Sequence, residues 1–214
     1  MSESFPAGVE RRSFPDHGGG QALATRGPPV YGEPTDGEWR LWNPNRSKLG
    51  AMFELGMSTG LEGGESVLYL GAASGTTASH VADFAGPTYA IEFSPRPARD
   101  LLDVAADRSN LFPLLKDARR PETYAHVVES GLDAIVQDVA TRGQAAVALE
   151  NAQFLRDGGW LLLAVKARSE DVTAEPEAVY DRVKNELSST FDIETARSLG
   201  RYHDDHLAIV ARKR

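Results

Sequence analysis

Three charged residues stand at positions where they could carry out proton chemistry. Asp138 and Lys166 each lie at the end of an apolar run that has the length of a strand. Lys48 precedes both runs, in a segment whose apolar residues have helical spacing. The carboxyl ends of parallel strands face one crevice, so we expect Asp138 and Lys166 to meet there. Buried lysines are costly unless they are paired, and an aspartate between two lysines provides the pairing.

A glycine turn marks the same predicted crevice. The stretch GAASGTT at 71–77 follows the apolar run 67–70 and precedes a helix that begins near Thr76. Small residues let a ligand approach the backbone, and the start of a helix offers free N–H groups. The spacing GxGxxG is absent and no lysine follows the second glycine, which weakens the case for a pyrophosphate.

Two further strand ends carry acids. Glu92 ends the second run, twenty-one residues after Gly71, where an acid can accept hydrogen bonds from ribose hydroxyls. Asp117 and Ala118 follow the third run, where the edge of an adenine would lie. Each element alone could be a tight turn with an exposed acid, but three at successive strand ends indicate an adenosine site.

Apolar runs that alternate with helical patterns position these residues, and they predict an α/β fold with a mostly parallel sheet covered on both faces. The last two runs have no helix between them, so we expect an antiparallel hairpin at one edge and a reversed last strand. The expected strands are 67–70, 88–93, 111–115, 133–138, 160–167, 192–199 and 206–212, and the expected helices are 77–85, 95–107, 143–156 and 175–189.

The first 42 residues differ from the rest of the chain. They hold a glycine run at 18–20, several prolines and short strand-like pieces, which predict a small β-rich region at 1–42. The main domain is expected at 43–214. The longest strongly apolar run, 160–165, is too short to span a bilayer, and the N-terminus has no apolar signal core. We therefore expect a cytoplasmic protein without a membrane partner.

The charge of the chain limits its partners. The 214 residues have a net charge of −8, with five lysines, eighteen arginines and no cysteine. An acid-rich, lysine-poor surface is typical of adaptation to high salt, although an arginine-rich background explains it equally well. The overall field repels a polyanion, so a nucleic-acid contact needs a local patch. Seven arginines could form such a basic rim or could be scattered ion pairs: Arg11, Arg12, Arg26, Arg46, Arg119, Arg120 and Arg168.

Seven stretches carry a family signature: WNPNRSKLGA at 42–51, YLGAASGTTASHVAD at 69–83, AIEFSPRPARDLL at 90–102, DARRPETY at 117–124, IVQDVATRGQA at 135–145, FLRDGGWLLLAVKARSED at 154–171 and HDDHLAIV at 203–210. Together they resemble fibrillarin, the family of ribose 2′-O-methyltransferases of box C/D guide ribonucleoproteins. The likeness covers nearly all of residues 40–212. The glycine- and arginine-rich tail of eukaryotic fibrillarins is missing, so the chain is similar to the archaeal form.

The resemblance implies a Rossmann-like class I methyltransferase domain, with a seven-stranded sheet, that binds S-adenosyl-L-methionine and no metal. It also implies that a guide RNA selects the target rRNA or tRNA, that a Nop-type scaffold protein carries the enzyme, and that a kink-turn-binding protein anchors the RNA. The scaffold is expected near 95–102. The implied cofactor-binding residues are Gly71, Ala73, Ser74, Gly75, Thr76, Thr77, Glu92, Phe93, Asp117, Ala118, Asp138 and Gln144.

The resemblance also implies a catalytic set of Lys48, Asp138, Lys166 and His206. Desolvation and neighbouring positive charge make a lysine easier to deprotonate, so Lys166 could accept the proton of the ribose hydroxyl or position its oxygen. Asp138 would orient Lys166 and the methyl donor, and Lys48 and His206 would support Lys166. Alternatively, Lys166 could simply extend from a strand end into water. A histidine at the start of an edge strand, as expected for His206, is often only a solvated or capping residue.

The chain departs from the family at one motif. Where fibrillarins read DVAQPDQ, this sequence reads DVATRGQ, so Thr141 and Arg142 replace a glutamine and a proline. Two other functions stay open. An NAD-dependent oxidoreductase would use the glycine turn and Glu92 but leaves the two lysines unexplained. A non-catalytic assembly subunit of the same particle would need only the fold.

Overall fold

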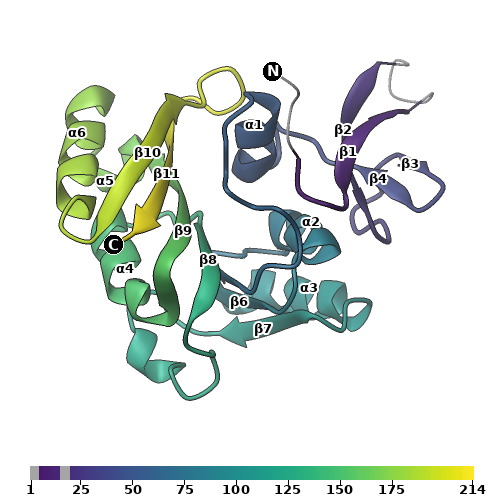
Figure 1. Ribbon diagram of the computed structural model, residues 1–214, viewed down its shortest axis with the longest axis horizontal. Helices are drawn as coiled ribbons and strands as arrows, with labels where there is room; N and C mark the ends of the chain where they lie inside the picture. Colours follow the sequence, from purple (N-terminus) through teal and green to yellow (C-terminus); the bar gives the residue numbers. More distant parts are fainter. Residues whose placement is uncertain (1–4, 15–19) are drawn as a thin grey trace.

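The computed structural model describes residues 5–14 and 20–214, and it contains two sheets. Most of the glycine run at 18–20 lies outside the described residues. A four-stranded antiparallel sheet has the order β1-β2-β4-β3 and lies at one side of the molecule, beyond α1 and α2 (Figure 1). Its strands are β1 (Val9–Ser13), β2 (Gln21–Arg26), β3 (Thr35–Asp36) and β4 (Trp39–Leu41).

The seven-stranded sheet has the order β10-β11-β9-β8-β5-β6-β7. Its strands are β5 (Val67–Leu70), β6 (Thr88–Glu92), β7 (Leu111–Leu115), β8 (Leu132–Gln137), β9 (Leu155–Lys166), β10 (Phe191–Ser198) and β11 (His206–Lys213). β5 to β9 pair in parallel, whereas β11 runs antiparallel to both β9 and β10. The predicted α/β fold with a reversed last strand is confirmed.

The position of β11 corrects one detail of the prediction. The hairpin lies at the edge of the sheet as expected, but β11 is its inner strand and β10 is the edge. The placement of His206 at the start of an edge strand was therefore wrong. Seven residues of β11 pair with β9, from His206 opposite Lys166 to Arg212 opposite Trp160.

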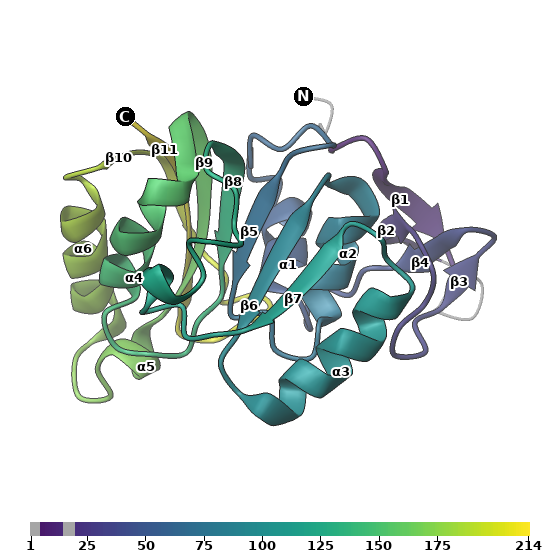
Figure 2. The ribbon, with the colours of Figure 1, turned by 90° about the horizontal axis from the view of Figure 1, so that it is seen from below.

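Helices cover both faces of this sheet. They are α1 (Lys48–Glu54), α2 (Thr76–Phe84), α3 (Pro95–Ala106), η2 (Pro121–Thr123), α4 (Gln144–Asn151), η3 (Ala152–Phe154), α5 (Ala167–Glu170) and α6 (Pro176–Leu187). Figure 2 shows α4 and α6 beside β8 to β11, and the buried residues of α1, α2 and α3 pack on the opposite face. Within the described ranges, no helix is long and apolar enough to cross a membrane.

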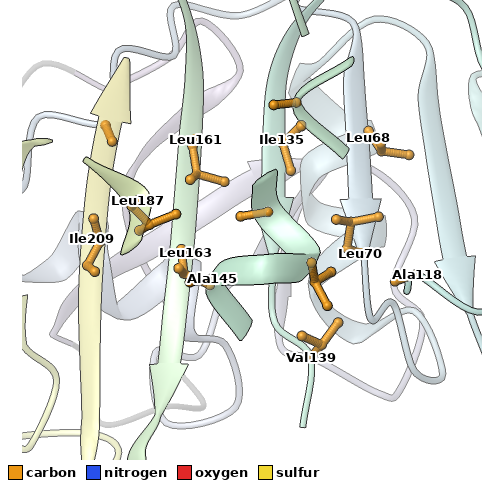
Figure 3. Close-up of a cluster of buried hydrophobic side chains, with 14 of the residues drawn as sticks. Leu68, Leu70, Ala118, Ile135, Val139, Ala145, Leu161, Leu163, Leu187 and Ile209 are labelled. Atoms are coloured by element: carbon orange, nitrogen blue, oxygen red, sulfur yellow. The ribbon is translucent and has the colours of Figure 1, made fainter. Parts of the chain in front are cut away.

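Side chains alternate between the two faces along each strand, as the pleat requires. In β5, Leu68 and Leu70 point into the core beneath α4 and α6, where they join Leu163 and Leu187 (Figure 3). Tyr69 and its neighbours on the same face pack under α1 and α2. Every residue of β5 is buried, which explains why its sequence is apolar throughout.

The boundary of one strand differs from expectation. β9 begins at Leu155 rather than near residue 160, and the helix before it ends earlier than expected. Gly158 has a φ of 70°, a conformation that favours glycine, and the pairing of β8 with β9 shifts register at this point. The glycine pair that reads as a break in the sequence is thus an irregularity inside a longer strand.

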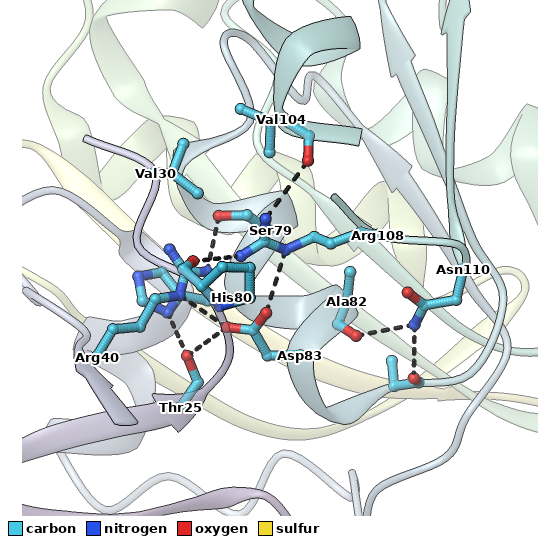
Figure 4. Close-up of polar contacts among 12 residues, drawn as sticks. Thr25, Val30, Arg40, Ser79, His80, Ala82, Asp83, Val104, Arg108 and Asn110 are labelled. Carbon is cyan, nitrogen blue, oxygen red and sulfur yellow. Dashed lines mark hydrogen bonds and ion pairs between the residues drawn. The ribbon is translucent and has the colours of Figure 1, made fainter. Parts of the chain in front are cut away.

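A buried polar cluster joins the small sheet to α2 (Figure 4). Arg40 is fully buried, and its Nε donates to Asp83 at 2.8 Å. Arg108 donates to the other Asp83 oxygen at 3.1 Å, Thr25 donates to Asp83 at 2.7 Å, and His80 Nδ1 lies 2.7 Å from the Thr25 hydroxyl. These side chains come from both sides of residue 42, where the sequence predicts the boundary between the regions 1–42 and 43–214. That boundary stays a prediction.

Candidate functional site

Asp138 lies between the two lysines that the sequence analysis singled out. Its Oδ2 is 3.2 Å from Lys48 Nζ and its Oδ1 is 2.8 Å from Lys166 Nζ. The three side chains are 22%, 16% and 16% exposed for Lys48, Lys166 and Asp138. Ser47 caps α1 by accepting from Gly50 N–H at 3.0 Å, which fixes the start of the helix that carries Lys48. We call these three residues the Lys-Asp-Lys clamp.

The Lys166 side of the clamp is an ion pair. The Nζ–Oδ1 distance is short, yet Asp138 Oδ1 is buried and has no partner with hydrogen-bond geometry among the described residues. Lys166 Nζ instead donates to the Asp138 carbonyl oxygen at 3.3 Å. The distance describes the attraction of the two charges.

His206 lies opposite Lys166 in the β11–β9 pair. Its Nδ1 is 2.5 Å from the Asp204 carbonyl oxygen, which can only accept, so Nδ1 carries the hydrogen and the neutral ring has its lone pair on Nε2. Burial lowers the pKa of His206 against the effect of this hydrogen bond, and the charges of Lys48 and Lys166 lower it further. His206 is therefore uncharged at neutral pH.

A second histidine lies nearby, and the sequence analysis gave it no role. The ring of His203 is 5.8 Å from that of His206, and its Nε2 contacts the Pro44 carbonyl oxygen at 2.8 Å. This contact ties the loop before β11 to the loop before Lys48. Burial lowers the pKa of His203 as well.

A cavity of about 400 Å³ adjoins the clamp at the carboxyl ends of the parallel strands. This is the crevice that the strand order predicts. Eight of the predicted site residues line it: Gly71, Ala73, Glu92, Phe93, Asp117, Ala118, Asp138 and Lys166.

The glycine turn lies against the clamp. Gly71 has a φ of 84°, and a Cβ at this position would lie 2.6 Å from the Asp138 carbonyl oxygen. Ala73 also has a positive φ, 48°, and its N–H donates to Glu92 Oε2 at 2.8 Å. The Ser94 N–H donates to the other Glu92 oxygen at 2.7 Å. Glu92 thus fixes the turn, while each of its oxygens keeps one lone pair for a ligand.

The remaining predicted residues lie around the cavity rather than on its wall. Gln144 is fully buried and exchanges two hydrogen bonds with the backbone of Lys166, at 2.9 and 3.1 Å. It holds the end of β9. Thr77 donates to Ser47 at 3.1 Å. The lining of the 400 Å³ cavity does not include Lys48, Ser74, Gly75, Thr76, Thr77, Gln144 or His206.

Several residues of the cavity wall were missed. Lys116 and Ser94 line it, as does Thr141, the residue at which this chain departs from DVAQPDQ. Arg119 also lines it, pairs with Asp117 at 2.7 Å and lies over the Phe93 ring at 5.9 Å. Their positions next to strand ends were the available signal, but residue type alone did not distinguish them from solvated loop residues.

Most of the seven arginines that the sequence analysis considered as a basic rim form ion pairs. Six of them have a carboxylate partner, so the alternative of scattered ion pairs is confirmed for those six. The pairs are Arg11–Glu54, Arg12–Asp36, Arg26–Glu38, Arg119–Asp117, Arg120–Glu122 and Arg168–Asp205.

The seven-stranded sheet with its reversed last strand and the crevice beyond β5 and β6 define a Rossmann-like class I methyltransferase fold. Comparison with known proteins gives the family. The fibrillarin family model matches residues 22–214, and the chain belongs to the fibrillarin family.

Relatives and solved structures cover nearly the whole chain. A fibrillarin-like rRNA/tRNA 2′-O-methyltransferase of Halorubrum lacusprofundi is 68% identical, over 99% of both chains. The fibrillarin of a fibrillarin/Nop5p complex is 40% identical with a TM-score of 0.89, over 99% of this chain and 100% of the other. Aeropyrum pernix fibrillarin with natively bound S-adenosyl-L-methionine is 45% identical with a TM-score of 0.81, over 95% and 94%.

Proposed function

We propose that this chain transfers a methyl group from S-adenosyl-L-methionine to ribose 2′-hydroxyls of rRNA and tRNA, directed by a box C/D guide RNA in the cytoplasm. The observation that carries the proposal is the Lys-Asp-Lys clamp at the wall of a cavity of about 400 Å³. An NAD-dependent oxidoreductase would leave this clamp without a role. A non-catalytic assembly subunit would not need two lysines held on one carboxylate.

The residues around the cavity fit this cofactor. When bound, it supplies an electrophilic methyl group on a sulfonium centre. The free lone pairs of Glu92 suit ribose hydroxyls, and the Phe93 ring, which is 63% exposed, offers an apolar face to an adenine beside Asp117 and Ala118. The methionine end would lie against the turn at 71–77, whose residues Gly71 and Ala73 line the cavity.

The clamp and His206 act on the ribose hydroxyl, which is the nucleophile. Because its ammonium is held beside Asp138, Lys166 donates a hydrogen bond to the ribose oxygen and stabilises the negative charge that develops there. Lys48 shares the carboxylate and keeps Asp138 in place. The free Nε2 of neutral His206 accepts the hydroxyl proton and passes it to water. Holding the oxygen in line with the methyl carbon supplies a large part of the rate.

The proposed partners are the guide RNA, a Nop-type scaffold protein and a kink-turn-binding protein. A solved relative forms a fibrillarin/Nop5p complex. The proposed scaffold surface is the N-terminal part of α3, at 95–102, where Leu102 is 58% exposed. Leu102→Asp should weaken scaffold binding in a pull-down and leave cofactor binding unchanged.

The function is tested by methylation of a guide-matched RNA with the partners added one at a time, followed by mass spectrometry of the ribose product. We expect transfer only with the complete particle. The chain alone should bind guide RNA weakly in a gel shift because its net charge is −8. Titration calorimetry should detect S-adenosyl-L-methionine binding and no NAD binding, and a preference for NAD would contradict the proposal.

A further inference from the structure

Arg46 differs from the other six arginines of the predicted rim. Among the described residues it has no carboxylate within ion-pair distance, whereas each of the other six has one. Its side chain is exposed. In a chain with a net charge of −8, a cation that stays unpaired on the surface is available for an anionic ligand.

An aromatic ring holds this cation next to the cofactor turn. The Arg46 guanidinium carbon lies 5.9 Å from the centre of the Tyr31 ring. The Tyr31 hydroxyl donates to the Ser74 carbonyl oxygen at 2.5 Å, so the ring is attached to the turn at 71–77. Stacking on a ring orders a guanidinium while leaving its N–H donors free.

Arg46 is close to the clamp along the chain. It lies two residues before Lys48, whose Nζ is 3.2 Å from Asp138. Ser47 between them caps α1, so the backbone from Arg46 to Lys48 is fixed. The backbone that carries Arg46 is therefore held in place next to Lys48, the first residue of α1.

The space beside Arg46 suits a small anionic group. Arg46, Tyr31, Asn43 and Thr76 line a cavity of about 110 Å³, separate from the larger one. The one carboxylate in this lining, Glu33, is already engaged: it accepts from the Tyr31 N–H at 2.9 Å and pairs with Arg40 at 3.3 Å. The cavity is too small for a nucleotide but has room for a phosphate group.

We propose that Arg46, held on Tyr31, binds a backbone phosphate of the target RNA strand next to the ribose that receives the methyl group. Guide pairing supplies the affinity for the target, and Arg46 places the strand at the clamp. This inference rests on the proposed function and assigns a substrate-positioning residue to it.

The test compares Arg46→Gln with Arg212→Gln in the reconstituted particle. Arg212 is a matched control because it is also exposed and stacks on an aromatic ring, 5.0 Å from the Trp160 ring centre, but it lies at the opposite end of β11 from His206. The readouts are the single-turnover methylation rate at several KCl concentrations and the Kd for S-adenosyl-L-methionine.

For Arg46→Gln we expect the rate to fall about 5- to 20-fold, and the slope of log rate against log salt to decrease by about one, as for the loss of one phosphate contact. The cofactor Kd should not change, and Arg46→Lys should recover most of the rate. An Arg46→Gln particle with the rate and salt slope of Arg212→Gln would overturn the inference. Failure of the unmodified particle to methylate ribose would instead overturn the proposed function.

Discussion

Two aspartates of this molecule each lie between two cationic side chains, yet their surroundings differ. Asp83 is 2% exposed, lies between Arg40 and Arg108, and both of its oxygens accept hydrogen bonds. Asp138 is 16% exposed, lies between two lysines, and its Oδ1 has no hydrogen-bond partner among the described residues. Within the part of the chain that the structure describes, both carboxylate oxygens of Asp83 are therefore engaged in hydrogen bonds, whereas Oδ1 of Asp138 is not.

The difference shows how a structural and a reactive charge cluster are built from the same acid. Guanidinium groups stay charged and form fixed, multiple hydrogen bonds, which suits the buried joint between the small sheet and α2. Burial raises the pKa of Asp83 even though Arg40 and Arg108 act to lower it. Lysines are compact and mobile donors, which suits a site where a substrate oxygen must share the ammonium.

The largest effect on stability should come from the cluster around Asp83. Asp83→Asn leaves two buried arginines without a full counter-charge and should lower the free energy of unfolding by about 3–5 kcal/mol. Asp138→Asn should lower it by about 1 kcal/mol or less because its partners can reach water. Urea unfolding of both variants measures this difference. Equal losses in the free energy of unfolding would contradict the distinction between the two aspartates.

The next effect concerns the turn that touches the clamp. Gly71→Ala places a Cβ 2.6 Å from the Asp138 carbonyl oxygen, so it should displace the clamp and lower methyl transfer about 100-fold. Gly131→Ala is the control, since Gly131 also has a positive φ, 79°, but open space around it. If single-turnover rates of the two variants were alike, contact with Asp138 would not be the reason for the glycine.

A smaller effect is expected at Glu92, the third acid of the cavity. Glu92→Gln replaces one charged acceptor by an amide donor that faces a backbone N–H, so the Kd for S-adenosyl-L-methionine should rise about 10-fold. Glu186→Gln on α6 provides the control. Calorimetry that found no change at Glu92 would remove its role in cofactor binding.

The smallest effect is a pH dependence of stability at the buried joint. Burial lowers the pKa of His80 well below its ordinary value, and Arg40 and Arg108 lower it further. Below about pH 6.5 the unfolded chain protonates this ring and the folded chain does not, so stability present above that pH is lost as the pH falls. Through His80, the free energy of unfolding changes by at most about 1.4 kcal/mol per pH unit.

This slope is measured by urea unfolding between pH 7 and pH 5. His80→Gln should flatten the curve, whatever its effect on the stability at pH 7. A variant with the slope of the unmodified protein would show that His80 does not cause the dependence.

Local patterns predicted the parts of the site that lie on successive strand ends. Asp138 and Lys166 could be placed together because parallel strands end at one edge of a sheet. The joint around Arg40 and Asp83 could not, since its residues are separated by 43 positions and neither stands at a strand end that faces the crevice. Gln144 has a structural contact with Lys166 that depends on the position of α4 beside β9.

The position of His206 shows the same limit of prediction from local sequence patterns. The sequence predicted its strand but not that β11 would be the inner strand of the hairpin. Strand order is set by packing between distant segments, which local periodicity does not report. The unpaired state of Arg46 likewise depends on which acids the fold brings near each arginine.

The most direct test of the account is the single-turnover rate of Lys166→Ala in the complete particle, with Lys184→Ala as the control. Lys184 is a partly exposed lysine on α6 that pairs with Asp181, so it has the same chemistry away from the cavity. We predict that Lys166→Ala slows methyl transfer about 1000-fold while cofactor Kd and particle assembly are unchanged. Transfer by Lys166→Ala at the rate of Lys184→Ala would contradict the role of the clamp.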